Sequence, residues 1–588
     1  MSVEKLITDH IDIWSSALRT RSTAGRGSNG KIDLYGIKKL RELILELAVR
    51  GKLVPQDPND EPASELLKRI AAEKAELVKQ GKIKKQKPLP EISKDEKPFE
   101  LPVGWEWQRL IELGSWAIGS GFPTSIQGIT CEDILMCKVS DMNLQGNEKF
   151  IKVTNNTISE ESAIQRKINV SEPGTVIFPK IGGAIATNKR RILVKKTAID
   201  NNCLGIRPFE RINLEWFFLI LNVIDMAKYQ SGTSMPAINQ SVIGNIVIAL
   251  PSECMQARIV AKVEELMFLC DQLEQRSLTS LDAHQQLVET LLATLTDSQN
   301  AEQLAKNWAR ISQHFDMLFI TEASIDALKQ TILQLAVMGK LVPQDPDDEP
   351  ASELLKRIEQ EKAQLVKEGK IKKQKPLPPV SDEEKPFDLP ERWEWCRVDD
   401  IGDLKLGRQR SPKDHHGPYM TPYLRVANVH DNEIRTDDLK FMNFTPEERV
   451  VFSLEYGDVL LNEGQSLELV GRPAIFREEV LGACFQNTLI RFRVKKLVSN
   501  EYLLAYFRHC LYSGRFQKAA TQTTNIAHLS VSRLSPVEVP LPPRNEQYKI
   551  VLKIKELEFL CDKAKVKMKA AQQTQLHLAD ALTDAALN

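Results

Sequence analysis

Two groups of basic and amide side chains are the residues of this chain whose types best fit a binding task. They fall in two stretches, about 108–249 and 396–540. Cationic side chains anchor phosphates, and guanidinium or amide groups can pair with base edges. Solvated surface charge is the alternative explanation. The candidate nucleic-acid contacts are Lys180, Lys189, Arg190, Arg191, Asn201 and Asn202 in the first stretch and Arg408, Arg410, Lys413, Arg425, Arg472, Gln486, Asn487, Arg491 and Arg493 in the second.

Motifs for catalysis or for cofactor binding are absent from the sequence. Gly-Lys occurs at Gly51 and Gly339, but neither pair has the upstream glycine or the following Ser/Thr of a phosphate-binding loop. No Gly-x-Gly-x-x-Gly follows a predicted strand, and no Asn/Asp-Pro-Pro-aromatic tetrad of an amino methyltransferase occurs. His415-His416 lacks the neighbouring thiols or the helical spacing of a metal site. We therefore predict a binding protein with no catalytic residues, no metal and no bound cofactor.

Composition indicates an intracellular globular protein of several domains. The 588 residues are 42% hydrophobic and carry a formal net charge of zero, so a polyanion site has to be a local patch. Nine cysteines without a Cys-x-x-Cys pair are typical of a reducing compartment. No apolar signal core and no run of eighteen apolar residues occurs. The expected location is the cytoplasm.

The positioning elements repeat along the chain. Residues 40–107 align with 328–395 without a gap, and 51 of the 68 positions are identical. A second repeat relates 250–271 to 541–562. The two stretches between these repeated blocks barely match. This arrangement predicts one framework that carries two different recognition domains.

Heptad patterns predict long helices after each variable stretch. Apolar residues recur at alternating steps of four and three, as in a coiled-coil seam. A long core helix is the alternative. Shorter helices should end at Gly51 and Gly339, and the last long helix should pair with the N-terminal helix. The predicted seam residues are Ile259, Val263, Leu266, Leu273, Leu287 and Leu291, with Ile550, Ile554, Leu557 and Met568 in the second copy.

The predicted fold class is α+β: two similar α/β domains, separated and joined by long helices that form an antiparallel coiled coil, with an internal pseudo-twofold repeat. Trp105 and Trp107, like Trp393 and Trp395, should lie in a half-buried strand that opens each domain. The expected divisions are an N-terminal helical region (1–53), a charged linker and helix (54–104), a first recognition domain (105–251), a central helical spacer (252–341), a second linker and helix (342–392), a second recognition domain (393–542) and a C-terminal helical region (543–588). Lys-rich segments close both linkers, at 82–87 and 370–375.

The whole chain resembles the specificity subunits of type I restriction-modification enzymes. The LVPQDPxDEPASELLKRI and GKIKKQKPLP blocks resemble regions of one subgroup, and LPxxWEW resembles the start of a target-recognition domain. The resemblance implies that each variable stretch reads one half of a split, asymmetric DNA sequence. It also implies a non-catalytic subunit that works with two modification subunits and two restriction subunits. S-adenosylmethionine, ATP and Mg²⁺ are then expected on the partners.

Two functions of other classes stay open from the residues alone. One is a self-sufficient DNA methyltransferase or nuclease with degenerate motifs, and the other is a repeat adaptor that binds only proteins. Activity of the isolated chain would favour the first, and failure to bind DNA with partners present would favour the second.

Overall fold

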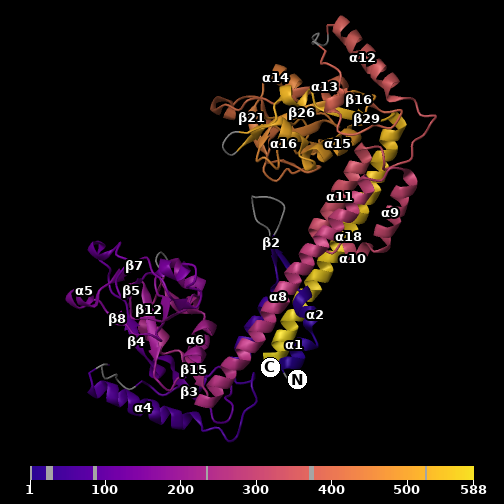
Figure 1. Ribbon diagram of the computed structural model, residues 1–588. Coiled ribbons are helices and arrows are strands. Elements are labelled where there is room, and N and C mark those ends of the chain that lie inside the picture. Colours follow the sequence, from indigo (N-terminus) through magenta and orange to yellow (C-terminus); the bar gives the residue numbers. More distant parts are fainter. Residues whose placement is uncertain are drawn as a thin grey trace. The chain divides into compact units, whose positions relative to one another are not determined.

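The computed structural model describes residues 3–21, 31–81, 83, 89–232, 236–369, 376–522 and 526–587 (Figure 1). It consists of two compact units, each holding one α/β domain and a bundle of helices. The first comprises Met1–Arg19, Ile32–Leu278 and Gln572–Asn588, and the second comprises Thr20–Lys31 and Thr279–Ala571. The lysines of the two Lys-rich segments (Lys82, Lys84, Lys85, Lys87, Lys370, Lys372, Lys373 and Lys375) lie outside the described residues.

The helices of the two units correspond. The first unit contains α1 (Val3–Thr8), α2 (Ile11–Ser16), α3 (Tyr35–Val49) and α4 (Ala63–Lys79). A short ribbon of β1 (Arg19–Arg21) and β2 (Lys31–Asp33) lies between α2 and α3 in the sequence. The second contains α9 (Ala301–Gln313), α10 (Phe315–Leu318), α11 (Glu322–Val337) and α12 (Ala351–Lys367). The two longest helices, α8 (Glu253–Thr296) and α18 (Arg544–Leu587), each contribute to both units.

Glycine ends α3 and α11 as predicted. Gly51 and Gly339 have φ of 68° and 67°, a left-handed conformation that favours glycine. The next amide reaches back into the last turn, with Lys52 N donating to Leu47 O and Lys340 N donating to Leu335 O, both at 2.9 Å. Each glycine also lies against a proline and a tryptophan ring of its own unit, so a side chain there would clash.

Two lysines show that α8 and α18 exchange roles between the units. Lys52 Nζ donates to Leu587 O at the end of α18 (2.7 Å), whereas Lys340 Nζ donates to Thr296 O at the end of α8 (2.6 Å). The first unit contains the N-terminal part of α8 and the C-terminal part of α18, and the second unit contains the other part of each helix, as an antiparallel pair requires. The prediction that the last helix pairs with the N-terminal helical region is therefore confirmed.

A second matched contact supports the same exchange. Arg41 of α3 donates to Asp271 of α8 at 2.7 Å, and its counterpart Lys329 of α11 donates to Asp562 of α18 at 2.5 Å. Tyr35 of α3 also donates to Asp580 of α18, at 2.6 Å.

The seam of α8 follows the predicted heptads only through Leu273. Ile259, Val263, Leu266 and Leu273 are buried, but Leu287 is 50% exposed and Val288 is 2% exposed, so the prediction for Leu287 is wrong. A straight α-helix drifts about 20° per heptad relative to a 3.5-residue repeat, which over four heptads approaches the 100° of one residue. The buried face therefore moves by one position, to Val288, Leu292 and Leu295, with Leu291 partly buried beside them.

The same shift occurs in α18. Ile550 and Ile554 are buried, and Leu557 and Met568 pack partly buried against the same core. Beyond Met568 the buried positions are Leu576 and Ala579, whereas Leu578 is exposed.

Each α/β domain opens and closes on a two-stranded ribbon. β3 (Glu106–Arg109) pairs with β15 (Val247–Leu250) in the first domain, and β16 (Glu394–Arg397) pairs with β29 (Glu538–Leu541) in the second. Trp107 and Trp395 lie in these strands and are half-buried against Phe99 and Phe387, as predicted. Trp105 and Trp393 are buried but directly precede the strands in which they were predicted. The ribbon brings the two ends of each domain together.

Two sheets form the first domain behind its ribbon. One has the order β4 (Gly114–Ile118), β12 (Cys203–Pro208), β9 (Val176–Pro179), β10 (Arg191–Leu193), β6 (Phe150–Ile151); the other has the order β7 (Asn156–Ile158), β5 (Ile134–Cys137), β11 (Thr197–Ile199), β8 (Val170–Ser171). Helix α6 (Leu214–Val223), the shorter α5 (Glu160–Gln165) and α7 (Gln240–Gly244), and a hairpin of β13 (Gln230–Ser231) and β14 (Ala237–Ile238) complete it.

The second domain repeats this plan. Its sheets have the orders β17 (Gly402–Leu406), β26 (Leu489–Val494), β22 (Val459–Asn462), β24 (Pro473–Ile475) and β21 (Lys440–Asn443), β18 (Met420–Leu424), β25 (Cys484–Phe485). Strand β23 (Gly464–Gln465) joins a hairpin of β27 (Thr521–Gln522) and β28 (Ala527–His528), and β19 (Val429–His430) pairs with β20 (Glu433–Ile434). Its helices are α13 (Val398–Ile401), α14 (Pro446–Phe452), α15 (Asn500–Tyr512), α16 (Arg515–Ala519) and α17 (Val531–Leu534).

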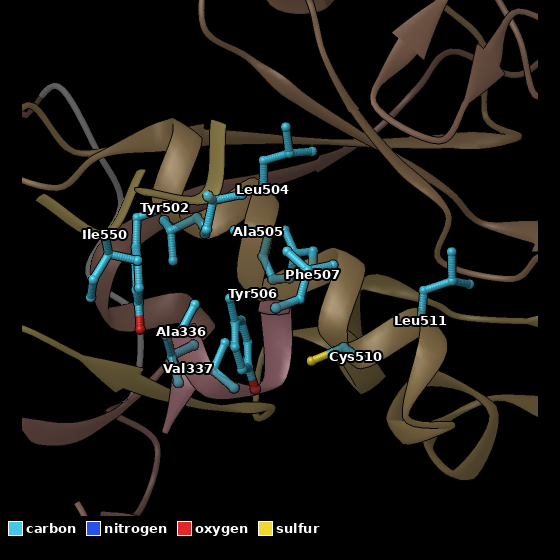
Figure 2. Close-up of a cluster of buried hydrophobic side chains, with 14 of the residues drawn as sticks. Ala336, Val337, Tyr502, Leu504, Ala505, Tyr506, Phe507, Cys510, Leu511 and Ile550 are labelled. Atoms are coloured by element: carbon cyan, nitrogen blue, oxygen red, sulfur yellow. The ribbon is translucent and has the colours of Figure 1, made fainter. Parts of the chain in front are cut away.

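Helix α15 attaches the second domain to its bundle. Figure 2 shows Tyr502, Tyr506 and Phe507 of α15 gathered with Ala336 and Val337 from the end of α11 and with Ile550 of α18. The Tyr502 hydroxyl donates to Pro540 O of the ribbon, and the buried Trp393 indole donates to Glu546 of α18 at 2.9 Å. The domain is thus packed on the helices of its own unit and is not a loosely tethered insert.

An arginine–glutamate ion pair joins each Pro-rich linker to its ribbon. Arg109 Nη1 donates to Glu96 (2.9 Å) and Asn245 O (3.0 Å), and Arg397 Nη1 repeats both contacts with Glu384 (2.8 Å) and Pro536 O (2.7 Å). The Arg397 guanidinium lowers the pKa of the Glu384 carboxyl to about 2.

Candidate nucleic-acid interface

Polar residues meet at one edge of the main sheet in each domain. In the first domain, the ends of β4 and β9 lie beside the turn between β11 and β12. We call the residues Ser120, Lys180, Asn201 and Asn202 at this place the first polar edge. Lys180 N donates to Asn202 O at 2.9 Å, and Ser120 forms a β-bridge with Asp200. Asn201 and Asn202 are exposed, and Lys180 and Ser120 are partly exposed. Three sequence-predicted residues, Lys180, Asn201 and Asn202, are therefore brought together.

The second domain builds the same edge with Asn487 in the place of Asn201, but with other residue types in the places of Ser120, Lys180 and Asn202. Arg408 forms a β-bridge with Gln486, and Glu463 N donates to Thr488 O at 2.9 Å. We call Glu463, Gln486, Asn487 and Thr488 the second polar edge; all four are partly exposed. Gln486 and Asn487 were predicted from the sequence, whereas Glu463, Thr488 and Ser120 were missed.

A glycine allows the strand end to approach the turn in both edges. A Cβ on Gly119 would lie 1.8 Å from Asp200 O, and a Cβ on Gly407 would lie 2.2 Å from Gln486 O. No side chain fits at such distances, so the backbone geometry itself requires glycine at these positions. Both domains meet this requirement in the same way.

Arg190 has a structural role and is withdrawn from the proposed nucleic-acid contacts. It is 2% exposed, and its guanidinium donates to Leu221 O (3.1 Å), Ile224 O (3.1 Å) and Asn188 Oδ1 (2.7 Å). The Leu221 and Ile224 carbonyls lie at the end of α6, where helical carbonyl groups lack partners. Burial lowers the pKa of Arg190 to about 10.

The neighbours of Arg190 are less enclosed. Lys189 is partly exposed and donates to Asn143 Oδ1. Arg191 is half-buried and donates to Arg190 O (2.7 Å) and Met142 O (3.0 Å), and burial lowers its pKa. Lys189 keeps a side chain that solvent reaches, and Arg191 is largely occupied within the domain.

Three arginines of the second domain are also held inside the fold. Arg408 pairs with Glu448 at 2.8 Å, and Arg491 is buried and donates to Ser453 O at 2.8 Å. Arg493 makes two bonds to the buried Asp458, at 2.7 and 2.8 Å. A carboxylate buried in this way needs its cationic partner. We withdraw these three arginines from the proposed contacts.

The remaining basic candidates of the second domain differ in exposure. Arg410 and Lys413 are exposed on the loop that follows β17, and Arg410 Nε lies 3.0 Å from His415 Nε2. Arg425 is partly exposed and pairs with Asp438. Arg472 is partly exposed, and burial lowers its pKa. Arg410 and Lys413 are thus the side chains most available to a phosphate.

The polar edges offer hydrogen-bond donors and acceptors without a reactive centre. Within the described ranges, no three His, Cys, Asp or Glu side chains gather as a metal ion would require. All nine cysteines are free. Among the described residues no helix is both long and apolar enough to cross a lipid bilayer.

Arg410 and Lys413 provide a test of phosphate contact. Each phosphate contact that is removed should lower the slope of log affinity against log salt by about one. We expect Arg410→Gln and Lys413→Gln each to reduce the slope for DNA binding, measured by titration from 50 to 200 mM salt.

Arg493→Gln is the matched control for these two substitutions. It removes the same charge from the same domain but leaves Asp458 buried and unpaired, so it should cost roughly 3 kcal/mol of stability and leave the salt slope unchanged. Equal slopes in all three variants and in the unmodified protein would remove Arg410 and Lys413 from the interface.

Two α/β domains with divergent polar edges on a repeated helical framework define a class of protein with two recognition modules. Comparisons with known proteins agree: the family described as type I restriction modification DNA specificity domain matches residues 390–566. The chain is 50% identical to the specificity subunit of the Escherichia coli type I restriction enzyme EcoEI and 49% identical to that of EcoAI, and each match covers 100% of both chains. This chain belongs to the family of type I restriction enzyme specificity subunits, which are non-catalytic.

A solved structure is a more distant match. The crystal structure of the HsdS subunit from Thermoanaerobacter tengcongensis shares 19% identity, covers 83% of this chain and 98% of that chain, and has a TM-score of 0.40.

Proposed function

We propose that this chain supplies the DNA specificity of a type I restriction-modification enzyme. Each α/β domain reads one half of a split, asymmetric target through its polar edge. The observation that carries the proposal is the contrast between the two copies. The framework repeats at 51 of 68 aligned positions, whereas the equivalent places on the polar edges hold Ser120 and Arg408, Lys180 and Glu463, and Asn202 and Thr488, with Asn201 and Asn487 alike. A protein that needs to read one sequence twice would keep both edges alike.

The repeated framework supports a partner that binds twice. A surface that occurs once in each unit offers the same contacts to two copies of one partner. The proposed assembly therefore contains two modification subunits, which bring S-adenosylmethionine and methylate adenine, and two restriction subunits, which bring ATP and Mg²⁺. In this proposed assembly, the chain itself binds neither S-adenosylmethionine nor ATP nor Mg²⁺.

Methyl transfer by purified components tests this division of labour. The chain alone should transfer no methyl group to DNA and cut none, because the groups for that chemistry belong to the partners. Addition of the modification subunit and S-adenosylmethionine should produce methylated adenine, and the mass of the purified complex should correspond to one specificity subunit with two modification subunits. Methylation by the chain alone, or a complex with a single modification subunit, would contradict the proposal.

A further inference from the structure

We propose that Lys180 and Glu463 are specificity-determining residues. Lys180 reads a guanine in one half-site, and Glu463 reads a cytosine in the other. The inference rests on the proposed function and assigns a role to one side chain in each domain. Lys180 directly follows β9, and Glu463 directly follows β22.

Hydrogen bonds show that the two positions are equivalent. Lys180 N donates to Asn202 O and Glu463 N donates to Thr488 O, both at 2.9 Å. On the other side, Ile238 N donates to Lys180 O and Leu529 N donates to Glu463 O, both at 2.8 Å. Each residue therefore lies between the strand-end turn and the last hairpin strand of its domain.

The backbone at these positions is the same, but the charge is opposite. Where the fold requires a residue type at this edge, both domains have it, as Gly119 and Gly407 show. The fold does not require a particular charge at a site where one copy has an ammonium group and the other has a carboxylate. Both side chains are partly exposed, so each can contact a group outside the domain.

The chemistry of the two groups specifies different bases. An ammonium group donates to the O6 and N7 acceptors that guanine presents in the major groove, whereas a carboxylate accepts from the N4 amine of cytosine. A carboxylate near DNA is repelled by phosphates, so its presence at this edge needs such a compensating contact. His528 Nδ1 lies 3.3 Å from Glu463 Oε2 and helps to orient it.

Reversal of the charge at each position tests the inference. Lys180→Glu and Glu463→Lys are introduced separately into the chain in cells with the modification subunit, and methylated adenines are mapped across the genome. Lys180→Glu should replace a guanine requirement at one position of one half-site, and Glu463→Lys should replace a cytosine requirement in the other. The preference between the old and the new base should change by roughly tenfold to hundredfold at that position.

Controls separate base reading from charge alone. Lys152→Glu in the first domain and Glu479→Lys in the second make the same charge changes at exposed positions away from the polar edges, and should leave the methylated sequence unchanged. Retention of the half-site of the unchanged domain shows that each variant folds.

Three outcomes overturn the assignment of Lys180 and Glu463. The first is an unchanged methylated sequence. The second is a uniform decrease in methylation, but not its loss, at all sites with no change of base preference, which would indicate contact with phosphate only. The third is a change in both half-sites at once. In the first two cases the chain still directs methylation to one split sequence, so the proposed function stands, whereas a protein with no split target in its unaltered form would refute the proposed function itself.

Discussion

Exchange of residues 110–246 for the corresponding segment of another specificity subunit should change one half of the methylated sequence completely and leave the other half intact. The segment lies between the strands of the β3–β15 ribbon, so the ribbon and the Arg109–Glu96 ion pair remain in place. Cores of its own, around Cys137 and Ile177 and around Met136 and Ala198, let the domain fold as a module. The methylated sequence in cells is the measurement.

The reciprocal exchange in the second domain provides the control. Residues 398–537 lie between β16 and β29 and should change only the other half-site. If either exchange alters both halves together, the domains do not read independently.

Insertion of seven residues into both long helices should lengthen the gap between the half-sites by about three base pairs. Seven helical residues add roughly 10 Å, and one base pair extends about 3.4 Å along the duplex. The insertion belongs between Leu278 and Thr279 of α8 and between Ala571 and Gln572 of α18, where the chain passes from one unit to the other. A site between Leu287 and Ser298 is unsuitable, because Val288, Leu292 and Leu295 there are buried.

A single-residue insertion at the same two places is the matched control. It rotates the following helical segment by about 100° and should abolish methylation without lengthening the gap. A seven-residue insertion that gives full activity with an unchanged gap would show that helix length does not set the spacing.

The sequence repeats were sufficient to predict the helical framework. Lys52 and Lys340 are the same residue of the repeat, and each caps the end of a long helix, as pairing of the last helix with the N-terminal region requires. The predicted seam is wrong at Leu287, because a strict seven-residue repeat and a straight α-helix differ in angle by an amount that grows along the helix. Only the packing of α8 shows where the buried face moves to Val288.

The interface was harder to predict, because composition does not distinguish an arginine that faces solvent from one that holds a fold together. Arg493 and Arg410 have the same chemistry, but Arg493 pairs with a buried carboxylate more than thirty positions away in the sequence. Glu463 was missed because a search for cations and amides excludes acidic residues. Its equivalence to Lys180 became visible only from the hydrogen-bond register of the two domains.

A map of methylated adenines in cells that carry this chain and its modification subunit tests the central claim most directly. Two readers on one framework predict methylation within a single split sequence, whose two specific halves differ and are separated by a gap of unspecified bases. Methylation of one continuous or palindromic sequence would contradict the claim that the two domains read two different half-sites.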